Sequence, residues 1–302
     1  MSSPPIDRPA TSPAFTGLQT GRKIRNRVAT GLVTLAFLLA VIPLFWVAWT
    51  VLRYGVSAIA SGSWWTHSLS GMLSSQFGGG VYHAIYGTLA QAVICAVISI
   101  PIGMMVGIYL VEYGARSRLA KATTFTVDIL SGVPSIVAAL FIYTLWIAIV
   151  GFPRSGFAVS LALVLLMVPV IVRTTEEMLK IVPNDLREAA YALGVPKWKT
   201  IVKIVIPTAM SGIVTGMMLA LARVMGETAP LLVLVGYAPF INFDLFDGNM
   251  AALPLVMVNE RNNPTPAGVE RMWGAALTLV LIITLFNLIA TIVSRRSAIK
   301  TK

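Results

Sequence analysis

The stretch EAAYALGVPKWKTIVKIVIP, from Glu188 to Pro207, connects two apolar segments of the chain. Phe157–Val172 precedes it and Ile206–Val235 overlaps its end. A helix that crosses a bilayer needs roughly 20 mostly apolar residues. The two flanking segments are therefore predicted to be membrane-spanning helices, and the stretch between them is predicted to lie at a membrane surface.

The composition extends this prediction to the whole chain. Of 302 residues, 57% are hydrophobic and only 12% are charged, whereas charged residues make up about 25% of a typical soluble domain. The predicted class is an all-α integral membrane protein with six transmembrane helices, which leave no room for a separate soluble domain of ordinary size. The candidate spans are Val28–Val51, His83–Val111, Val127–Val150, Phe157–Val172, Ile206–Val235 and Trp273–Val293.

The formal net charge of +11 comes mainly from Lys and Arg in alternate connecting segments. These are the N-terminal tail, the loops after the second and fourth spans, and the C-terminal tail. Cytosolic loops of membrane proteins carry such an excess of basic residues. Both termini are therefore expected to be cytosolic. The basic residues are interpreted as topology determinants and lipid-headgroup contacts, and no nucleic-acid partner is expected.

The sequence divides into four parts. Residues 1–26 are Pro-, Ser- and Thr-rich and then basic, and are expected to form a disordered cytosolic tail. Residues 27–82 hold the first span and an external loop, and this span is too long for the core of a signal peptide. Residues 83–294 form the main transmembrane domain, in which 183–207 is the fourth connecting loop. Residues 295–302 form a second cytosolic tail.

The loop 183–207 carries the signals of two short helices. Asp185 is a candidate N-cap, and Glu188 three residues later completes a capping-box pattern. Gly194 can adopt the left-handed conformation that ends a helix. Pro196 suits the first turn of the next helix, and Pro207 is expected to mark its entry into the membrane.

Small side chains give this loop the properties of a contact surface. Ala189 and Ala190 would let another protein approach the helix backbone closely. On these features alone, an ordinary connector at the membrane interface remains an equal alternative.

Two glycine pairs are candidates for close helix packing. Gly103 and Gly107 lie in the second span, and Gly212 and Gly216 lie in the fifth. Small residues four apart let membrane helices approach each other closely. The alternative is coincidence in a glycine-rich chain.

Arg223 and Glu227 are charged residues within the fifth predicted span. Charges at bilayer depth are costly and are usually paired or functional. At a spacing of i and i+4 they would share a helix face and pair. One interpretation is a buried ion pair that fixes helix packing. The other is a polar transport path in which Arg223 donates hydrogen bonds to a tetrahedral oxyanion, Glu227 neutralises it when no ion is present, and Thr228 adds a hydroxyl.

The spacing in the fourth loop resembles that of ABC-importer permeases. Such permeases carry Glu-Ala-Ala, three residues, Gly, nine residues and then Ile-x-Leu-Pro; this chain has Glu188-Ala189-Ala190, Gly194 and Ile204-Val205-Ile206-Pro207. The one departure is Ile206, where the family has Leu. The resemblance implies a type I ABC-importer permease fold, with a coupling helix seated in a cleft of a cytosolic ATPase and Glu188 and Gly194 at the contact.

The chain contains no GxxxxGK[ST] phosphate-binding loop. ATP and Mg²⁺ are therefore expected to be bound by the partner ATPase, and no cofactor, metal site or catalytic residue is expected in this chain, which would not be an enzyme by itself. The only cysteine, Cys95, lies in an apolar span, so neither an intrachain disulfide nor a cysteine-based metal site is expected.

The run Arg223–Leu232 resembles the fifth-span signature of phosphate ABC-importer permeases, and Gly132–Val137 is similar to a second segment of that family. Within such importers, Thr228-Ala229-Pro230-Leu231-Leu232 resembles the PstA type better than the PstC type. Ala138-Ala139 departs from the expected bulky residue followed by Gly. The resemblance covers the chain from about residue 80 to its end and leaves the first 25 residues outside.

The resemblance implies a multi-pass protein of the bacterial plasma (inner) membrane, which forms the translocation path of an ATP-driven phosphate importer. Its partners would be a second, PstC-type permease, an ATPase dimer and an external phosphate-binding protein. Three alternatives stand beside this interpretation: a permease for sulfate or molybdate, an uncoupled channel or scaffold, and an intramembrane enzyme. The loop 183–207, which resembles an ATPase docking loop, argues against an uncoupled channel or scaffold. An intramembrane enzyme would need a catalytic set at membrane depth, and the sequence shows none. His67 and His83 are the only histidines, and both are expected to be external or interfacial.

Overall fold

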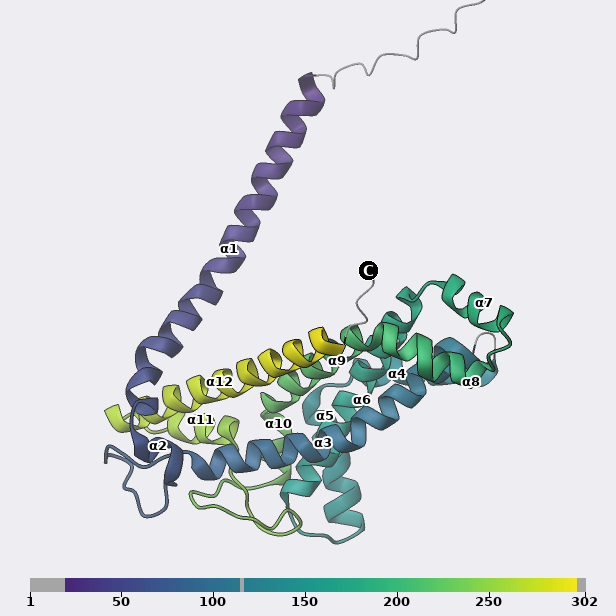
Figure 1. Ribbon diagram of the computed structural model, residues 1–302. Coiled ribbons are helices and arrows are strands. Elements are labelled where there is room, and N and C mark those ends of the chain that lie inside the picture. The colour runs from purple at the N-terminus through teal and green to yellow at the C-terminus, as the bar shows by residue number, and fades with distance from the viewer. Residues whose placement is uncertain (1–19, 115–116, 298–302) are drawn as a thin grey trace, which may run out of the picture. The chain divides into compact units, whose positions relative to one another are not determined.

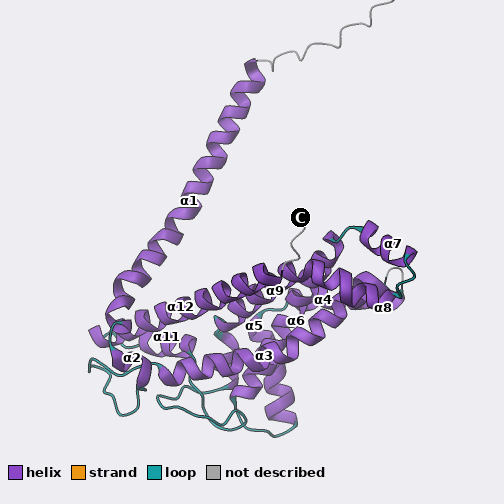
Figure 2. Cartoon of the chain, in the orientation of Figure 1, coloured by secondary structure: helices purple, strands orange, loops and turns teal. Residues whose placement is uncertain are grey.

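The computed structural model describes residues 20–114 and 117–297, and within these ranges it contains helices and loops but no strands (Figure 2). The chain divides after Thr50 into two compact units. In the described part, the first unit is the N-terminal portion of helix α1 (Thr20–Ile59). The apolar stretch of this helix buries none of its residues, so its side chains are available to lipid or to another protein.

The second unit begins with the end of α1 and contains all the other helices (Figure 1). Three of them are extended by a π-helical segment: η1 follows α3, η2 follows α5 and η3 follows α8. The bounds are α2 Gly62–Thr66, α3 Tyr82–Ile108, η1 Tyr109–Tyr113, α4 Arg118–Ser131, α5 Ser135–Ile142, η2 Tyr143–Ile149, α6 Gly156–Ile181, α7 Asn184–Ala192, α8 Lys197–Thr200, η3 Ile201–Val205, α9 Ile206–Met225, α10 Ala229–Leu234, α11 Leu253–Arg261 and α12 Pro266–Ser297.

Five helical segments of the described chain are long and apolar enough to cross a membrane. They are Gly21–Ile59, Tyr82–Tyr113, Gly156–Ile181, Lys197–Met225 and Pro266–Ile292. The all-helical membrane class predicted from the sequence is confirmed. Six spans are reached only if α4 and α5–η2 together count as one.

The prediction that the third span is one continuous helix over Val127–Val150 is wrong. The chain bends by 105° between Arg118–Ser131 and Ser135–Ile149. Pro134 has no N–H to donate and forces the residue before it out of the helical conformation. Together with Gly132, it ends α4 and starts a new helix in another direction.

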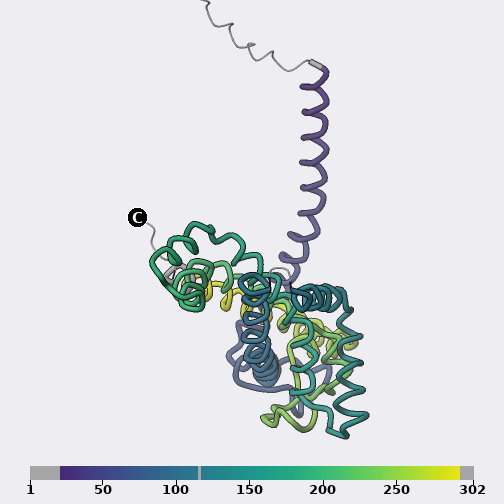
Figure 3. Tube along the Cα trace, turned by 90° about the vertical axis from the view of Figure 1, so that its right-hand side faces the viewer, coloured from purple at the N-terminus to yellow at the C-terminus, as the bar shows by residue number. Residues whose placement is uncertain are grey.

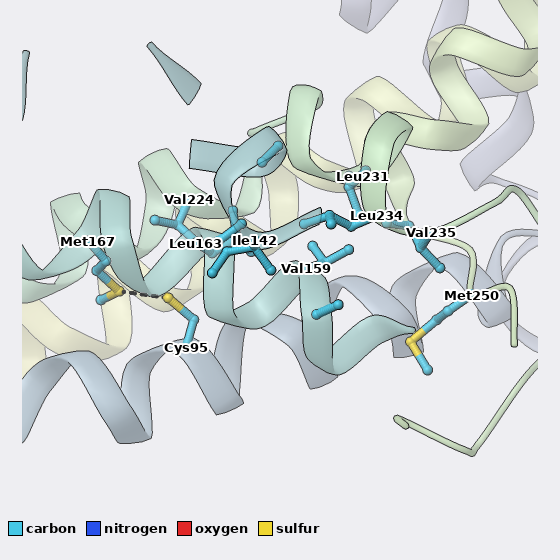
Figure 4. Packing of buried hydrophobic residues seen from close by; sticks show 14 of the residues in the cluster. Cys95, Ile142, Val159, Leu163, Met167, Val224, Leu231, Leu234, Val235 and Met250 are labelled. Atoms are coloured by element: carbon cyan, nitrogen blue, oxygen red, sulfur yellow. Dashed lines mark hydrogen bonds between the residues drawn. The ribbon is translucent and has the colours of Figure 1, made fainter. Parts of the chain in front are cut away.

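Helix α6 lies at the centre of the second unit, with α3 on one side and α9 on another. Its buried side chains join those of α3, α9 and α10 in one apolar cluster (Figure 4). In that cluster the Cys95 thiol of α3 lies 3.5 Å from the Met167 sulfur of α6. Helix α12 packs against α9 and α11.

All four glycines predicted to serve helix packing face α6. A β-carbon at Gly103 or Gly107 of α3 would lie 2.6 Å from Ile171 or 2.7 Å from Thr175. On α9, a β-carbon at Gly212 would lie 2.1 Å from the sulfur of Met178, and one at Gly216 would lie 1.9 Å from Thr174. A larger residue at any of these positions would overlap an α6 side chain unless that side chain or the helix shifted.

Gly107→Ala is expected to destabilise the chain because α3 and α6 must separate to admit the methyl group. Overpacking of this kind costs typically 1–3 kcal/mol. The measurement is thermal unfolding of the purified protein in detergent. Gly31→Ala in α1 is the matched control, because a β-carbon there meets nothing within 4 Å. Equal midpoints for the two variants would contradict the packing role of Gly107.

Candidate functional site

The loop 183–207 folds as two helices joined by a tight turn, α7 and α8. Gly194 follows α7 with φ of +74°. Its N–H donates to Tyr191 O at 2.9 Å, and the N–H of Val195 donates to Ala190 O at 3.0 Å. This is the Schellman pattern, in which two carbonyls at the helix end are satisfied by the residues that follow. Gly194 ends the helix as predicted, and a side chain would strain its left-handed backbone.

The start of α7 differs from the prediction. The helix begins at Asn184, Pro183 occupies the N-cap position, and no side chain caps the helix there. Asp185 therefore lies inside the first turn, where its carboxylate faces the positive end of the helix dipole. The predicted Asp185–Glu188 capping box is wrong, and Glu188 is left free for other contacts.

The second helix of the loop continues into the fifth span, as predicted. Pro196 is the N-cap of α8 and not its first helical residue. From Lys197 the chain stays helical through η3 to Met225. Pro207 thus lies within a continuous helix. Proline lacks an N–H, and its ring crowds the carbonyl four residues earlier. Pro207 therefore explains the π-helical turn Ile201–Val205 just before it.

The loop exposes both the predicted residues and large apolar ones. Glu188 and Ala189 are exposed, whereas Ala190 is buried. Leu193 has 83% of its surface exposed, and Trp198 is also exposed. In Figures 1 and 3, α7 and α8 project from the rest of the second unit. Exposed apolar side chains on a projecting segment are typical of a surface that another protein covers. Sequence reasoning emphasised the alanines and missed Leu193 and Trp198, although both lie inside the motif.

A groove of about 600 Å³ lies between α6 and α9. Arg223, in the last turn of α9, is exposed in this groove and forms no ion pair with any residue in 20–114 or 117–297. Its guanidinium is therefore available to a bound anion. The polar residues that line the groove beside it are Thr174, Glu177, Ser211 and Thr215. Sequence reasoning found Arg223 and missed the contribution of α6.

The predicted pairing of Arg223 with Glu227 is wrong. Helix α9 ends at Met225, and the chain turns at Gly226 before α10 begins at Ala229. Glu227 is thus beyond the helix and does not share its face with Arg223. The predicted span Ile206–Val235 is broken at this turn.

Glu227 instead lines a small cavity with Thr88 and Gln91 of α3. The amide nitrogen of Gln91 is buried and has no hydrogen-bond partner in the described chain. Thr228 is partly buried at the N-cap of α10, and its hydroxyl donates to the Gly226 carbonyl at 3.5 Å. Arg223 and Glu227, both predicted for the transport path, therefore lie close in sequence but line different spaces.

An ion-pair network on α6 was not predicted. Glu176 accepts hydrogen bonds from Arg173 and Lys180, both at 2.7 Å. Arg173 also pairs with Asp128, which attaches α4 to α6. The spacing of Arg173, Glu176 and Lys180 along one helix face was a readable signal, but the partner on α4 was not.

Comparison with known proteins places this geometry in a family. The family model described as "Binding-protein-dependent transport system inner membrane component" matches residues 99–299. The chain is 57% identical over 293 residues to the "Phosphate transport system permease protein PstA 1" of Mycobacterium tuberculosis, covering 97% of this chain and 95% of that protein. It is 39% identical over 278 residues to the corresponding PstA of Pasteurella multocida, covering 90% of this chain and 95% of that one.

Solved structures share the fold at low sequence identity. A permease chain of the inward-facing MetNI methionine ABC transporter has a TM-score of 0.57 at 20% identity, covering 72% of this chain and 94% of its own. A bacterial ABC transporter that imports the acidic polysaccharide alginate gives 0.61 at 12% identity, covering 93% and 100%. Together with the family match and the apolar helices, these findings show that the chain belongs to the binding-protein-dependent transport system inner membrane components, the permeases of ABC importers.

Proposed function

We propose that this chain is the PstA-type permease subunit of an ATP-driven phosphate importer. The observation that carries the proposal is the 57% identity to a phosphate transport permease over 97% of the chain. The groove between α6 and α9 supports it, because Arg223 is exposed there and has no ion-pair partner among the described residues. Its guanidinium offers the planar donor pattern that suits a tetrahedral oxyanion.

The importer would contain three kinds of partner. A second, PstC-type permease would complete the translocation path, and an external phosphate-binding protein would deliver the ion. An ATPase dimer would bind ATP and Mg²⁺, since this chain has no phosphate-binding loop of its own. The exposed surface of α7 and α8, with Glu188 and Leu193, supports docking of the ATPase at this loop.

The mechanism would be alternating access. ATP binding closes the ATPase dimer, and α7 passes that movement to the membrane helices. Helix α8 is continuous with α9, whereas α7 follows α6 directly along the chain. A displacement of α7 therefore acts on both walls of the groove that holds Arg223. The permease would supply the path and its gating, while the chemical step of ATP hydrolysis takes place in the partner.

A permease for sulfate or molybdate is the competing proposal, because these ions have a size and charge close to those of phosphate. The test is uptake of labelled phosphate into proteoliposomes that hold this chain with its proposed partners and contain ATP inside. We expect phosphate accumulation that excess unlabelled phosphate suppresses and that equal sulfate or molybdate leaves unchanged. Accumulation of labelled sulfate or molybdate, with no phosphate uptake, would refute the substrate assignment but not the permease assignment.

A further inference from the structure

The C-terminal end of α3 is attached to α7 by a buried ion pair. The Nε and Nη2 atoms of Arg187, on α7, donate to Glu112 Oε1, in η1, at 3.1 and 2.8 Å. The side chains are only 12% and 5% exposed. Exposed ion pairs contribute little because water competes for both groups. This pair is largely shielded from water, and separating it would leave a buried charge without a partner.

The same guanidinium also holds the end of α6. Arg187 Nη1 donates to the carbonyl of Val182 at 2.7 Å, and Nη2 donates to the carbonyl of Leu179 at 3.0 Å. One side chain on α7 therefore fixes the C-terminal ends of both α3 and α6. These two helices also pack against each other at Gly103 and Gly107.

A second contact approaches Glu112 from the other side of the loop. The ammonium group of Lys197, the first residue of α8, donates to the Glu112 carbonyl and lies 4.7 Å from the centre of the Tyr113 ring. Residues on both sides of the turn at Gly194 thus converge on the last residues of η1. The end of α3 is therefore contacted by both helices of the loop.

The N-terminal half of α3 lies beside the turn between α9 and α10. Gln91 and Thr88 line the small cavity that Glu227 also lines, and the Gln91 amide is buried there without a partner in the described chain. A shift of α3 would therefore alter the surroundings of the turn at Gly226. Helix α3 thus extends from the loop 183–207 to this turn. Among the described residues, Glu112–Arg187 is the only ion pair between α7 and the α3–η1 helix.

We propose that the Glu112–Arg187 pair is the link through which α3 follows the docking helix α7, so that ATP hydrolysis drives transport only while this link is intact. The inference rests on the proposed function, because it assumes that an ATPase moves α7. Both residues are positioning residues. Glu112 is too buried to touch the ATPase itself, and it acts through the helix that it holds.

A reversible cross-link tests this directly. Cys95 is the only cysteine, so a Cys95→Ala background allows Glu112→Cys and Arg187→Cys to be labelled alone. The importer is reconstituted with its partners, and phosphate transported per ATP hydrolysed is measured before and after a short bis-methanethiosulfonate reagent that reductant removes. Without reagent, the double variant is expected to retain ATPase binding and hydrolysis but to lose about fivefold or more of its transport per ATP. With reagent, the ratio should return towards that of the background.

Lys180→Gln is the matched control, since it removes an ion pair at the same end of α6 whose lysine is 61% exposed. Its ratio should equal that of the background. The proposal is overturned if the uncross-linked double variant keeps the background ratio, or if the ratio stays low after mass spectrometry shows the cross-link. A background that hydrolyses ATP but imports no phosphate would instead refute the phosphate assignment, and the ratio would then be measured with the oxyanion that is imported.

Discussion

Glu188→Lys is expected to abolish ATP-driven phosphate uptake while leaving the permease folded. Glu188 is exposed on α7 and forms no hydrogen bond or ion pair with the described residues, so the fold does not depend on it. Under the proposed function, this residue lies at the ATPase contact. A lysine there would reverse the charge at the proposed contact, and a mismatch of charge at an interface costs several kcal/mol.

The measurement for Glu188→Lys is co-purification of the ATPase with the permease, followed by uptake in proteoliposomes. Asp247→Lys is the control: it makes the same charge change at an exposed position in the loop between α10 and α11. ATPase binding should be lost in the first variant and kept in the second. Full ATPase recovery and full uptake with Glu188→Lys would show that this face of α7 is not the docking site.

Arg223→Ala is expected to reduce phosphate uptake at least tenfold without loss of ATPase binding. The side chain is exposed in the groove between α6 and α9 and has no ion-pair partner among the described residues, so its removal should leave the fold unchanged. A hydrogen bond to a charged group contributes about 1.5–3 kcal/mol, and one guanidinium can form two such bonds to an oxyanion.

Two further variants sharpen the Arg223 prediction. Arg223→Lys keeps the charge but loses the planar pair of donors, so its uptake should fall between those of the wild type and the alanine variant. Arg154→Ala is the control, because Arg154 stacks on Tyr143, outside the residues that line the groove. If the Arg223→Ala variant takes up phosphate as fast as the wild type, Arg223 is not part of the transport path.

The fold shared with the methionine and alginate transporters has a bearing on specificity. Those structures are 20% and 12% identical to this chain and align over most of their own length. One backbone architecture thus accommodates very different substrates, and function resides in the side chains of particular sites.

Local rules predicted the features that depend on neighbouring residues. The end of α7 at Gly194 followed from the conformational freedom of glycine, and the apolar spans followed from their length and composition. Local rules failed where a single residue interrupts a longer pattern. Average hydrophobicity concealed the bend at Pro134, and the i, i+4 spacing of Arg223 and Glu227 was misread because Gly226 ends the helix between them.

Contacts between distant residues could not be predicted from one sequence. Glu112 and Arg187 are 75 residues apart, and each resembles an ordinary charged residue of a basic loop. The convergence of the four packing glycines on α6 is of the same kind, because the motif predicts close packing but not the partner helix. Such contacts depend on how the helices are arranged, which the sequence pattern of any one helix does not contain.

Phosphate accumulation in proteoliposomes with and without hydrolysable ATP tests the central claim most directly: this chain is a gate that a separate ATPase drives. The vesicles hold this chain with its proposed permease and ATPase partners, contain either ATP or a non-hydrolysable analogue, and receive the loaded binding protein outside. The account predicts that phosphate rises above its external concentration only with hydrolysable ATP. Equal phosphate movement with both nucleotides, stopping at equilibrium, would identify an uncoupled channel and contradict the account.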